Sequence, residues 1–123
     1  MKLLVCGGRD YKDVEHFNKE MSNIFSLYQN QIDTIIEGGA SGADNMAKNY
    51  ALKNKIKLIE VKADWQHFGK AADPIRNQKM LSMLDDNDCV LAFWNGVSKG
   101  TRNMIEIARN KNIKVIIINI NIE

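Results

Sequence analysis

Short apolar runs alternate along the chain with longer segments in which apolar residues recur every three or four positions. The apolar runs cover residues 3–6, 34–37, 57–61, 89–93 and 115–118. Their length of four or five residues and their content of Val, Ile and Leu are typical of buried strands. The sequence therefore predicts five strands.

The longer segments predict helices, because their apolar residues fall on one face of a helix with 3.6 residues per turn. The first covers residues 14–28, the second runs from about 43 to 53, and the last carries the apolar residues of 104–108. We expect Pro74 to open the third helix at position N1, where proline is tolerated. The segment before it, ADWQHFGKAAD at 63–73, is predicted to be a long loop.

Strands and helices in this order predict an α/β fold with a mostly parallel sheet of five or more strands, flanked by helices on both faces. A single proline and the absence of a polar linker indicate one domain over residues 1–123. The tail NINIE, at 119–123, is a candidate extension of the fifth strand.

Composition counts against several function classes. The chain is 45% hydrophobic and 26% charged with a net charge of +2, which is ordinary for a globular protein and below the charge of a dedicated nucleic-acid binder. Cys6 and Cys89 lie in apolar runs without metal-ligand spacing, so we expect buried thiols, no metal and no cofactor. The apolar start is too short for a signal core and no segment is long enough to cross a membrane, so we expect a cytoplasmic protein without a membrane partner.

The loops that leave the first four strands carry the candidate chemistry, because ligands of open parallel sheets bind at the carboxyl ends of the strands. These loops read GGRDYKD, GGASGAD, ADWQHFGKAAD and WNGVSKGT. Glycine-rich loops before helix starts can hold an anion, since the first helical N–H groups are unpaired. The loops and the first turns beyond them also carry the cations Arg9, Lys12, His67, Lys70, Arg76, Lys99 and Arg102. Together these features favour a phosphate-bearing ligand over a purely structural role for the glycines.

Several of these residues have two interpretations. Arg9, which follows Gly7 and Gly8, suits bidentate contact with phosphate and would also serve as a turn cap. Asp44 follows Ser41 by three positions, which favours a capping box over contact with ribose hydroxyls. Two other acids, Asp10 and Glu37, are open to sugar contact or to a role as loop charges. The aromatic residues of the third loop are expected to anchor it to the core, with base stacking as the alternative; they are Trp65, His67 and Phe68.

The motifs resemble a known family. VCGGRDY at 5–11, EGGASGAD at 37–44, ADWQHFGKAADPIRNQKM at 63–80 and AFWNGVSKGTRNMIEIA at 92–108 are similar to the SLOG superfamily, in its YspA-like, cpYpsA-related branch. The resemblance implies a Rossmann-like fold. Relatives in the wider superfamily include the Lonely Guy phosphoribohydrolases, which release the base from nucleoside 5'-monophosphates, sensors of nucleotide-derived signals and a DNA-processing protein. Because the phosphoribohydrolases are dimers, the resemblance also implies a homo-oligomer.

The resemblance assigns roles to individual positions. It implies that a nucleotide lies over one loop and that a second loop holds its phosphate, with Arg76 and Asn77 nearby. The first loop comprises Gly38, Gly39, Ser41 and Gly42, and the second comprises Gly96, Lys99, Gly100 and Thr101. Lys99 is the cation with the fewest alternative roles. Asn103 stands where the phosphoribohydrolases have a glutamate that works with the arginine, and Glu106 is the nearest acid.

Three function classes follow. The first and favoured class is a binding module for a nucleotide or nucleotide-derived signalling molecule, acting as sensor, sponge or carrier. The second is a hydrolase of the N-glycosidic bond of such a nucleotide, in which Arg76 and Glu106 would be the catalytic residues. The third, a nucleic-acid-processing factor, is disfavoured by the modest charge and by the lack of interleaved aromatic residues.

Overall fold

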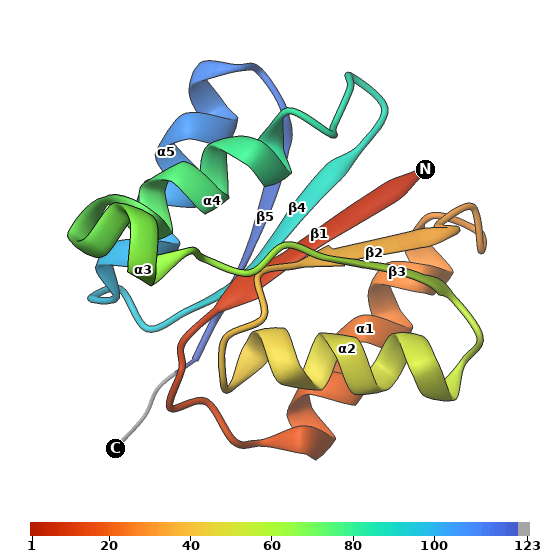
Figure 1. The fold of residues 1–123 in the computed structure, drawn as a ribbon. Coiled ribbons are helices and arrows are strands. Elements are labelled where there is room, and N and C mark those ends of the chain that lie inside the picture. Colours follow the sequence, from red (N-terminus) through yellow and green to blue (C-terminus); the bar gives the residue numbers. More distant parts are fainter. Residues whose placement is uncertain (121–123) are drawn as a thin grey trace.

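The structure, a computed structural model, describes residues 1–120. Five strands alternate with helices along the chain (Figure 1). The strands are β1 (Lys2–Gly7), β2 (Thr34–Glu37), β3 (Lys57–Glu60), β4 (Cys89–Trp94) and β5 (Lys114–Asn119). The helices are α1 (Val14–Leu27), α2 (Ala43–Lys53), α3 (Trp65–Phe68), the 3-10 turn η1 (Gly69–Ala71), α4 (Ala72–Leu81) and α5 (Lys99–Asn110).

The five strands form one parallel sheet in the order β3-β2-β1-β4-β5. The register places Leu4 of β1 between Ile36 of β2 and Val90 of β4. The chain runs outward from β1 to β3, then crosses to β4 on the other side of β1 and continues to β5. The predicted α/β, Rossmann-like architecture is therefore confirmed.

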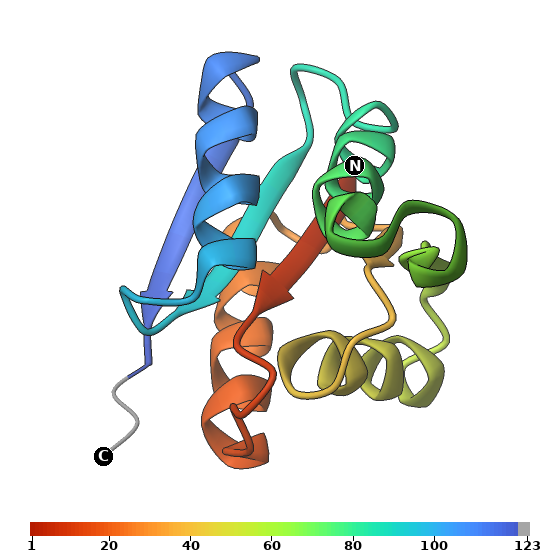
Figure 2. The same ribbon diagram turned by 60° about the vertical axis from the view of Figure 1, so that its left-hand side comes forward.

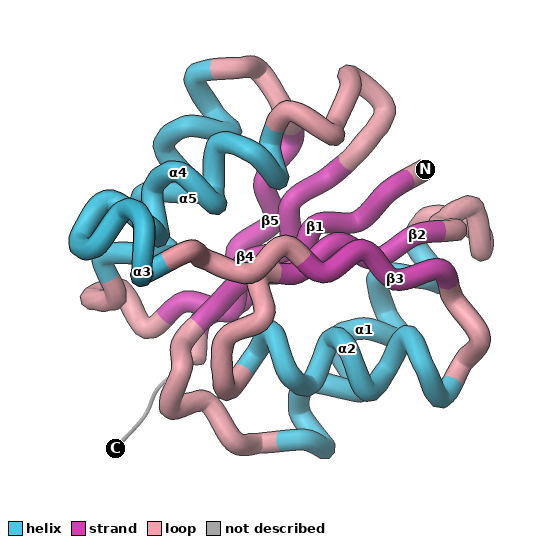
Figure 3. The backbone as a smooth tube through the Cα atoms, in the orientation of Figure 1, coloured by secondary structure: helices cyan, strands magenta, loops and turns pink. Residues whose placement is uncertain are grey.

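Helices cover both faces of this sheet. Figure 3 shows α1 and α2 on one side of the strands and α4 and α5 on the other. Leu3 and Val5 face α1 and α2, whereas Leu4 and Cys6 face α4 and α5, because successive side chains of a strand point to opposite faces. Each face forms its own buried cluster. Both faces of β1 are thus apolar, which explains its uninterrupted apolar run.

Several predicted element bounds need correction: the first helix ends at Leu27 and not at residue 28, and β1, β4 and β5 are each longer than predicted. Helix α4 begins at Ala72, two residues before Pro74; proline fits there because the N–H groups of the whole first turn have no intrahelical partner. The segment predicted as one long loop contains α3, which the Asp64 side chain caps by accepting from His67 N–H, and then η1. The strand predicted to reach Val61 ends at Glu60.

The predicted extension of the fifth strand into the tail, residues 119–123, can be checked only up to residue 120. The fifth strand reaches Asn119, and residues 121–123 lie outside the described residues.

The strand order reverses between β1 and β4, and the carboxyl ends of the five parallel strands lie at the same edge. Figure 2 shows this for β1, β4 and β5. Ligands of open parallel sheets bind at such a switch point. Loops from β1, β2 and β4 and the start of α4 come together at this edge, which makes it the place to look for a site. Within residues 1–120, no helix has the length and apolar character to cross a membrane.

Candidate ligand-binding site

A cavity of about 390 Å³ lies at the switch point. Its walls come from Gly7 to Asp10 after β1, from Asp73 to Asn77 on α4, and from the loop and first turn that lead from β4 into α5. Ala40 and Asp44 close it on the side of β2. We call this space the main cavity.

A second cavity of about 270 Å³ adjoins the first. It is lined by residues 38–41, by Lys62 and Ala63 after β3, and by Trp65. The two cavities share four lining residues, namely Arg9, Ala40, Asp73 and Arg76. We call this space the side cavity.

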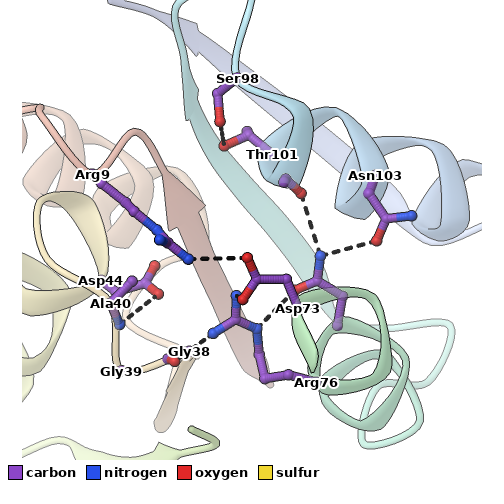
Figure 4. Close-up of polar contacts among 12 residues, drawn as sticks. Arg9, Gly38, Gly39, Ala40, Asp44, Asp73, Arg76, Ser98, Thr101 and Asn103 are labelled. Carbon is purple, nitrogen blue, oxygen red and sulfur yellow. Dashed lines mark hydrogen bonds and ion pairs between the residues drawn. The ribbon is translucent and has the colours of Figure 1, made fainter. Parts of the chain in front are cut away.

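An ion-pair bridge marks the boundary between the two cavities (Figure 4). Asp73 accepts from Arg9 Nη2 through Oδ2 at 3.0 Å and from Arg76 Nη2 through Oδ1 at 3.2 Å. Arg76 is nearly buried and also donates to the Gly38 carbonyl and to Asn77 Oδ1. Arg9 is half-exposed and lies over the Trp65 ring, so it is the more accessible of the two arginines.

The glycines of the first two loops interlock the backbone. The Gly8 carbonyl accepts from the N–H of Ala43, the first residue of α2, at 3.2 Å, and Ser41 Oγ donates to the Arg9 carbonyl at 3.2 Å. A Cβ at Gly42 would overlap the Gly8 carbonyl oxygen. The Gly8 carbonyl thus occupies the leading N–H group of α2, which leaves fewer donors there for the predicted anion site.

Asp44 lies buried at the wall of the main cavity. Its Oδ2 accepts from Ala40 N–H at 3.2 Å, and its residue surface is 6% exposed. Burial raises the pKa of Asp44 to about 6, although the Ala40 N–H and the charges of Arg76 and Arg9 act in the opposite direction. The capping-box interpretation is wrong: Gly42 is the N-cap without a side-chain bond, and Ser41 points to Arg9 instead.

Cys6 lies behind Asp44 in the same wall. Burial, followed by the negative charge of Asp44, raises the pKa of its thiol well above the usual range. Both cysteines are free and buried, as the sequence predicted. A thiol in this state is a packing group and not a nucleophile.

The start of α5 provides the open helix terminus of the site. Asn95 Oδ1 accepts from the N–H groups of Val97 and Ser98 and thereby shapes the turn before the helix. Within the described chain, no acceptor pairs with the N–H groups of Lys99, Gly100 or Thr101. These groups and the helix dipole favour an anion at this end of the main cavity.

Asn77 ties α4 to α5. Its Nδ2 donates to the Gly100 carbonyl at 3.3 Å and to Asn103 Oδ1 at 3.0 Å. Asn103, which the resemblance alone sets at the position of the phosphoribohydrolase glutamate, is thus held by Asn77 and is not among the residues that line the main cavity. Glu106 is exposed further along α5 and lines neither cavity, so the structure does not bring it to the site.

The remaining predicted residues divide between the cavities. Gly7, Gly8, Arg9, Arg76, Asn77, Gly100 and Thr101 line the main cavity, whereas Gly38, Gly39 and Ser41 line the side cavity. Gly42 and Gly96 line neither. Lys99 lines a third cavity of about 230 Å³ on the far side of Asp73 and Asn77, and it is exposed. Lys99, the cation that the sequence favoured most as a ligand contact, is therefore not among the residues that line the main cavity.

The aromatic residues of the third loop do not anchor it to the core. Trp65 is 50% exposed and Phe68 is 48% exposed, and the His67 side chain is also exposed. The anchoring interpretation is wrong, because α3 lies on the surface with Trp65 against Arg9. Trp65 instead presents a ring at the side cavity.

Two glutamates meet at the ends of β2 and β3. Glu37 and Glu60 are register partners, and Glu37 is fully buried with Oε1 accepting from Gly39 N–H at 2.6 Å. Its Oε2 has no donor while both groups are ionised, and a proton on Glu37 would supply the hydrogen bond to Glu60. Burial and this bond raise the pKa of Glu37 to about 8, whereas the bond lowers that of Glu60, which also pairs with Lys48 and Lys62.

Asp73 was missed by the sequence interpretation. Its signal was present in the spacing, since Asp73 precedes Arg76 by three positions, the separation at which helical residues face one another. The link to Arg9 could not be found in this way, because the two residues are 64 positions apart.

Comparisons with known proteins identify the family. A family described as the YspA, cpYpsA-related SLOG family matches residues 1–68, more than half of the chain. The chain belongs to this family. It is also 31% identical over 121 residues to the Gene 61 protein of Mycobacterium phage D29, with 94% of each chain covered. A comparison with solved structures gave no significant match.

Membership of the YspA, cpYpsA-related SLOG family indicates a role in the binding or processing of a nucleotide-related molecule. The family match ends at Phe68, so it covers the loops after β1 and β2 but not the start of α5.

Proposed function

We propose that this SLOG-family protein binds a nucleotide or a nucleotide-derived signalling molecule in the main cavity. The observation that carries the proposal is the pairing, within one cavity of about 390 Å³, of an open helix start with a half-exposed arginine and a buried carboxylate. The first two groups suit a phosphate and the third suits the hydroxyl groups of a sugar.

The arrangement assigns a role to each group. The N–H groups at the start of α5 and the Arg9 guanidinium would hold the phosphate from two sides. Asp44, whose Oδ2 already accepts from Ala40, would accept a hydrogen bond from the sugar through its other oxygen. Trp65 presents an aromatic surface at the side cavity, where a base would stack.

The proposal is tested first with native mass spectrometry of the purified protein, which detects a copurified nucleotide. A thermal-shift panel of nucleoside mono-, di- and triphosphates and cyclic nucleotides follows. A ligand at about 100 times its Kd adds roughly 2.7 kcal/mol to the free energy of unfolding and raises Tm by about 10 °C in a domain of this size. An unchanged melting curve across the panel contradicts the proposal.

The matched pair of variants is Arg9→Gln and Arg109→Gln. Arg109 is exposed in the last turn of α5, at the opposite end of that helix from the main cavity. We expect Arg9→Gln to remove most of the ligand-induced shift and Arg109→Gln to leave it unchanged. Equal loss in both would indicate non-specific attraction of anions to surface charge.

Hydrolysis of an N-glycosidic bond is the second candidate, favoured by the raised pKa of Asp44. A carboxyl group with a pKa of about 6 in a cavity is suited to proton transfer near neutral pH. Chromatography of a long incubation with nucleoside 5'-monophosphates would detect released base. Base release that is lost in Asp44→Asn and kept in Glu106→Gln would support this function and assign the acid to Asp44.

A further inference from the structure

The charges around the two joined cavities balance one another. Three cations and three carboxylates line them; the cations are Arg9, Lys62 and Arg76 and the carboxylates are Asp10, Asp44 and Asp73. Lys62 is further neutralised by Glu60 at 3.7 Å. Such a site offers little net attraction to a ligand that carries several negative charges.

Asp73 is the acid that neutralises the arginine charge at the place where a phosphate would bind. It is bonded to both arginines, and it lines the main cavity, the side cavity and the third cavity beside Lys99. Asp44 lies deeper and bonds to the Ala40 N–H, so it does not occupy the guanidinium groups. A phosphate that approaches Arg9 must therefore share this arginine with the Asp73 carboxylate.

We propose that Asp73 sets the charge specificity of the site, so that the protein selects nucleotides with one phosphate group over di- and triphosphates. This inference rests on the proposed function and names its ligand class. Each further ionised phosphate adds charge beside the Asp73 carboxylate, and like charges in close contact weaken binding. One phosphate matches Arg9, the more accessible of the two arginines, together with the N–H groups at the start of α5.

The test compares wild type with Asp73→Asn, which keeps the size of the side chain and removes its charge. Isothermal titration with adenosine and guanosine 5'-mono-, di- and triphosphates gives the affinity for each. In the wild type, we expect the monophosphate of the preferred base to bind about tenfold more tightly than the triphosphate. In Asp73→Asn, triphosphate affinity should rise about tenfold and monophosphate affinity by clearly less.

The control is Asp86→Asn, which removes a charge from an exposed turn before β4 that lines neither cavity. It should leave every affinity unchanged. If Asp73→Asn does not fold, Asp73→Ser removes the same charge with a smaller polar side chain.

The outcomes separate the two proposals. If the wild type binds nucleotides but prefers triphosphates, the role of Asp73 is overturned and the proposed function stands. The same holds if the affinities of Asp73→Asn match those of the wild type. A failure of every nucleotide to bind either protein would overturn both. A triphosphate gain in Asp86→Asn equal to that in Asp73→Asn would assign the effect to net charge and also overturn the role of Asp73.

Discussion

The two glycine-bearing loops that the sequence presents as equivalent do different work. In residues 38–42, after β2, a side chain at Gly38 would meet Arg76 and Asp44. One at Gly42 would overlap the backbone of Gly8 and Arg9, in the loop after β1. In the turn after β4 and the first turn of α5, a side chain at Gly96 or Gly100 would meet no atom of the described residues within 4 Å, the α5 backbone around Gly100 aside. We call residues 38–42 the packed loop and the segment that leads from β4 into α5 the open loop.

The difference shows that glycine marks two separate requirements. After β2, glycine lets the backbones of two loops approach so closely that the Gly8 carbonyl caps α2. After β4, Gly96 has a φ of 85°, which shapes a turn and leaves the start of α5 uncovered. The packed loop therefore builds the wall of the main cavity, while the open loop supplies its unpaired N–H groups.

The largest difference between the two loops is expected in the stability of Gly42→Ala compared with that of Gly100→Ala. Gly42 has a φ of 75° and its new methyl group would overlap backbone atoms, so we expect a loss of at least about 3 kcal/mol in the free energy of unfolding and a fall in Tm of more than about 10 °C. Gly100 lies in the first turn of α5 with open space around it, so alanine there should change stability by less than about 1 kcal/mol. Thermal and urea unfolding of both variants measure the difference. Equal losses would show that the two loops are equally packed.

The buried acids of the packed region predict a pH dependence that the open loop lacks. The folded-state pKa of Glu37 is raised to about 8, above its unfolded value of about 4.5, so the folded protein binds more protons between these pH values. The stabilising contribution of this group is therefore fully present below about pH 4.5. It is lost as pH rises towards 8, at up to roughly 1.4 kcal/mol per pH unit. Asp44 acts in the same direction between its unfolded value and about pH 6.

Glu37→Gln isolates this effect. The variant should lose the decline in stability between about pH 6 and 8 and keep the part below pH 6 that Asp44 contributes. Glu106→Gln, at an exposed position on α5, should keep the whole profile. Urea unfolding at several pH values supplies the measurement, and an unchanged slope in Glu37→Gln would count against a protonated Glu37.

The smallest effect is expected at Lys99, which tests how far the open region extends. Lys99 lines the third cavity and not the main one, so Lys99→Ala should weaken nucleotide binding by less than about threefold, whereas Arg9→Gln should weaken it by more than about tenfold. Titration calorimetry at two salt concentrations checks this order. A larger loss in Lys99→Ala would move the phosphate to the third cavity.

The fold could be predicted almost completely from the sequence. Buried strands such as β1 and β4 are apolar on both faces, and the helices carry one apolar stripe, so local periodicity alone separates the two. The segment containing α3 could not be assigned, because a one-turn helix on the surface has no apolar face to reveal it. The start of α4 was missed by two residues, because proline is tolerated throughout a first turn.

The site could be predicted only in outline. The sequence determined which loops lie at the carboxyl edge of the sheet, since this follows from the order of strands and helices, and it brought Gly7, Arg9, Arg76 and Gly100 to that edge. Tertiary structure alone decided that Gly8 closes the start of α2, that Asp73 joins Arg9 to Arg76, and that Lys99 lies outside the main cavity. The physical reason is that local sequence sets where a loop begins and ends, whereas the partner of a backbone carbonyl or a long charged side chain is chosen among groups distant in sequence that only packing brings within about 3 Å.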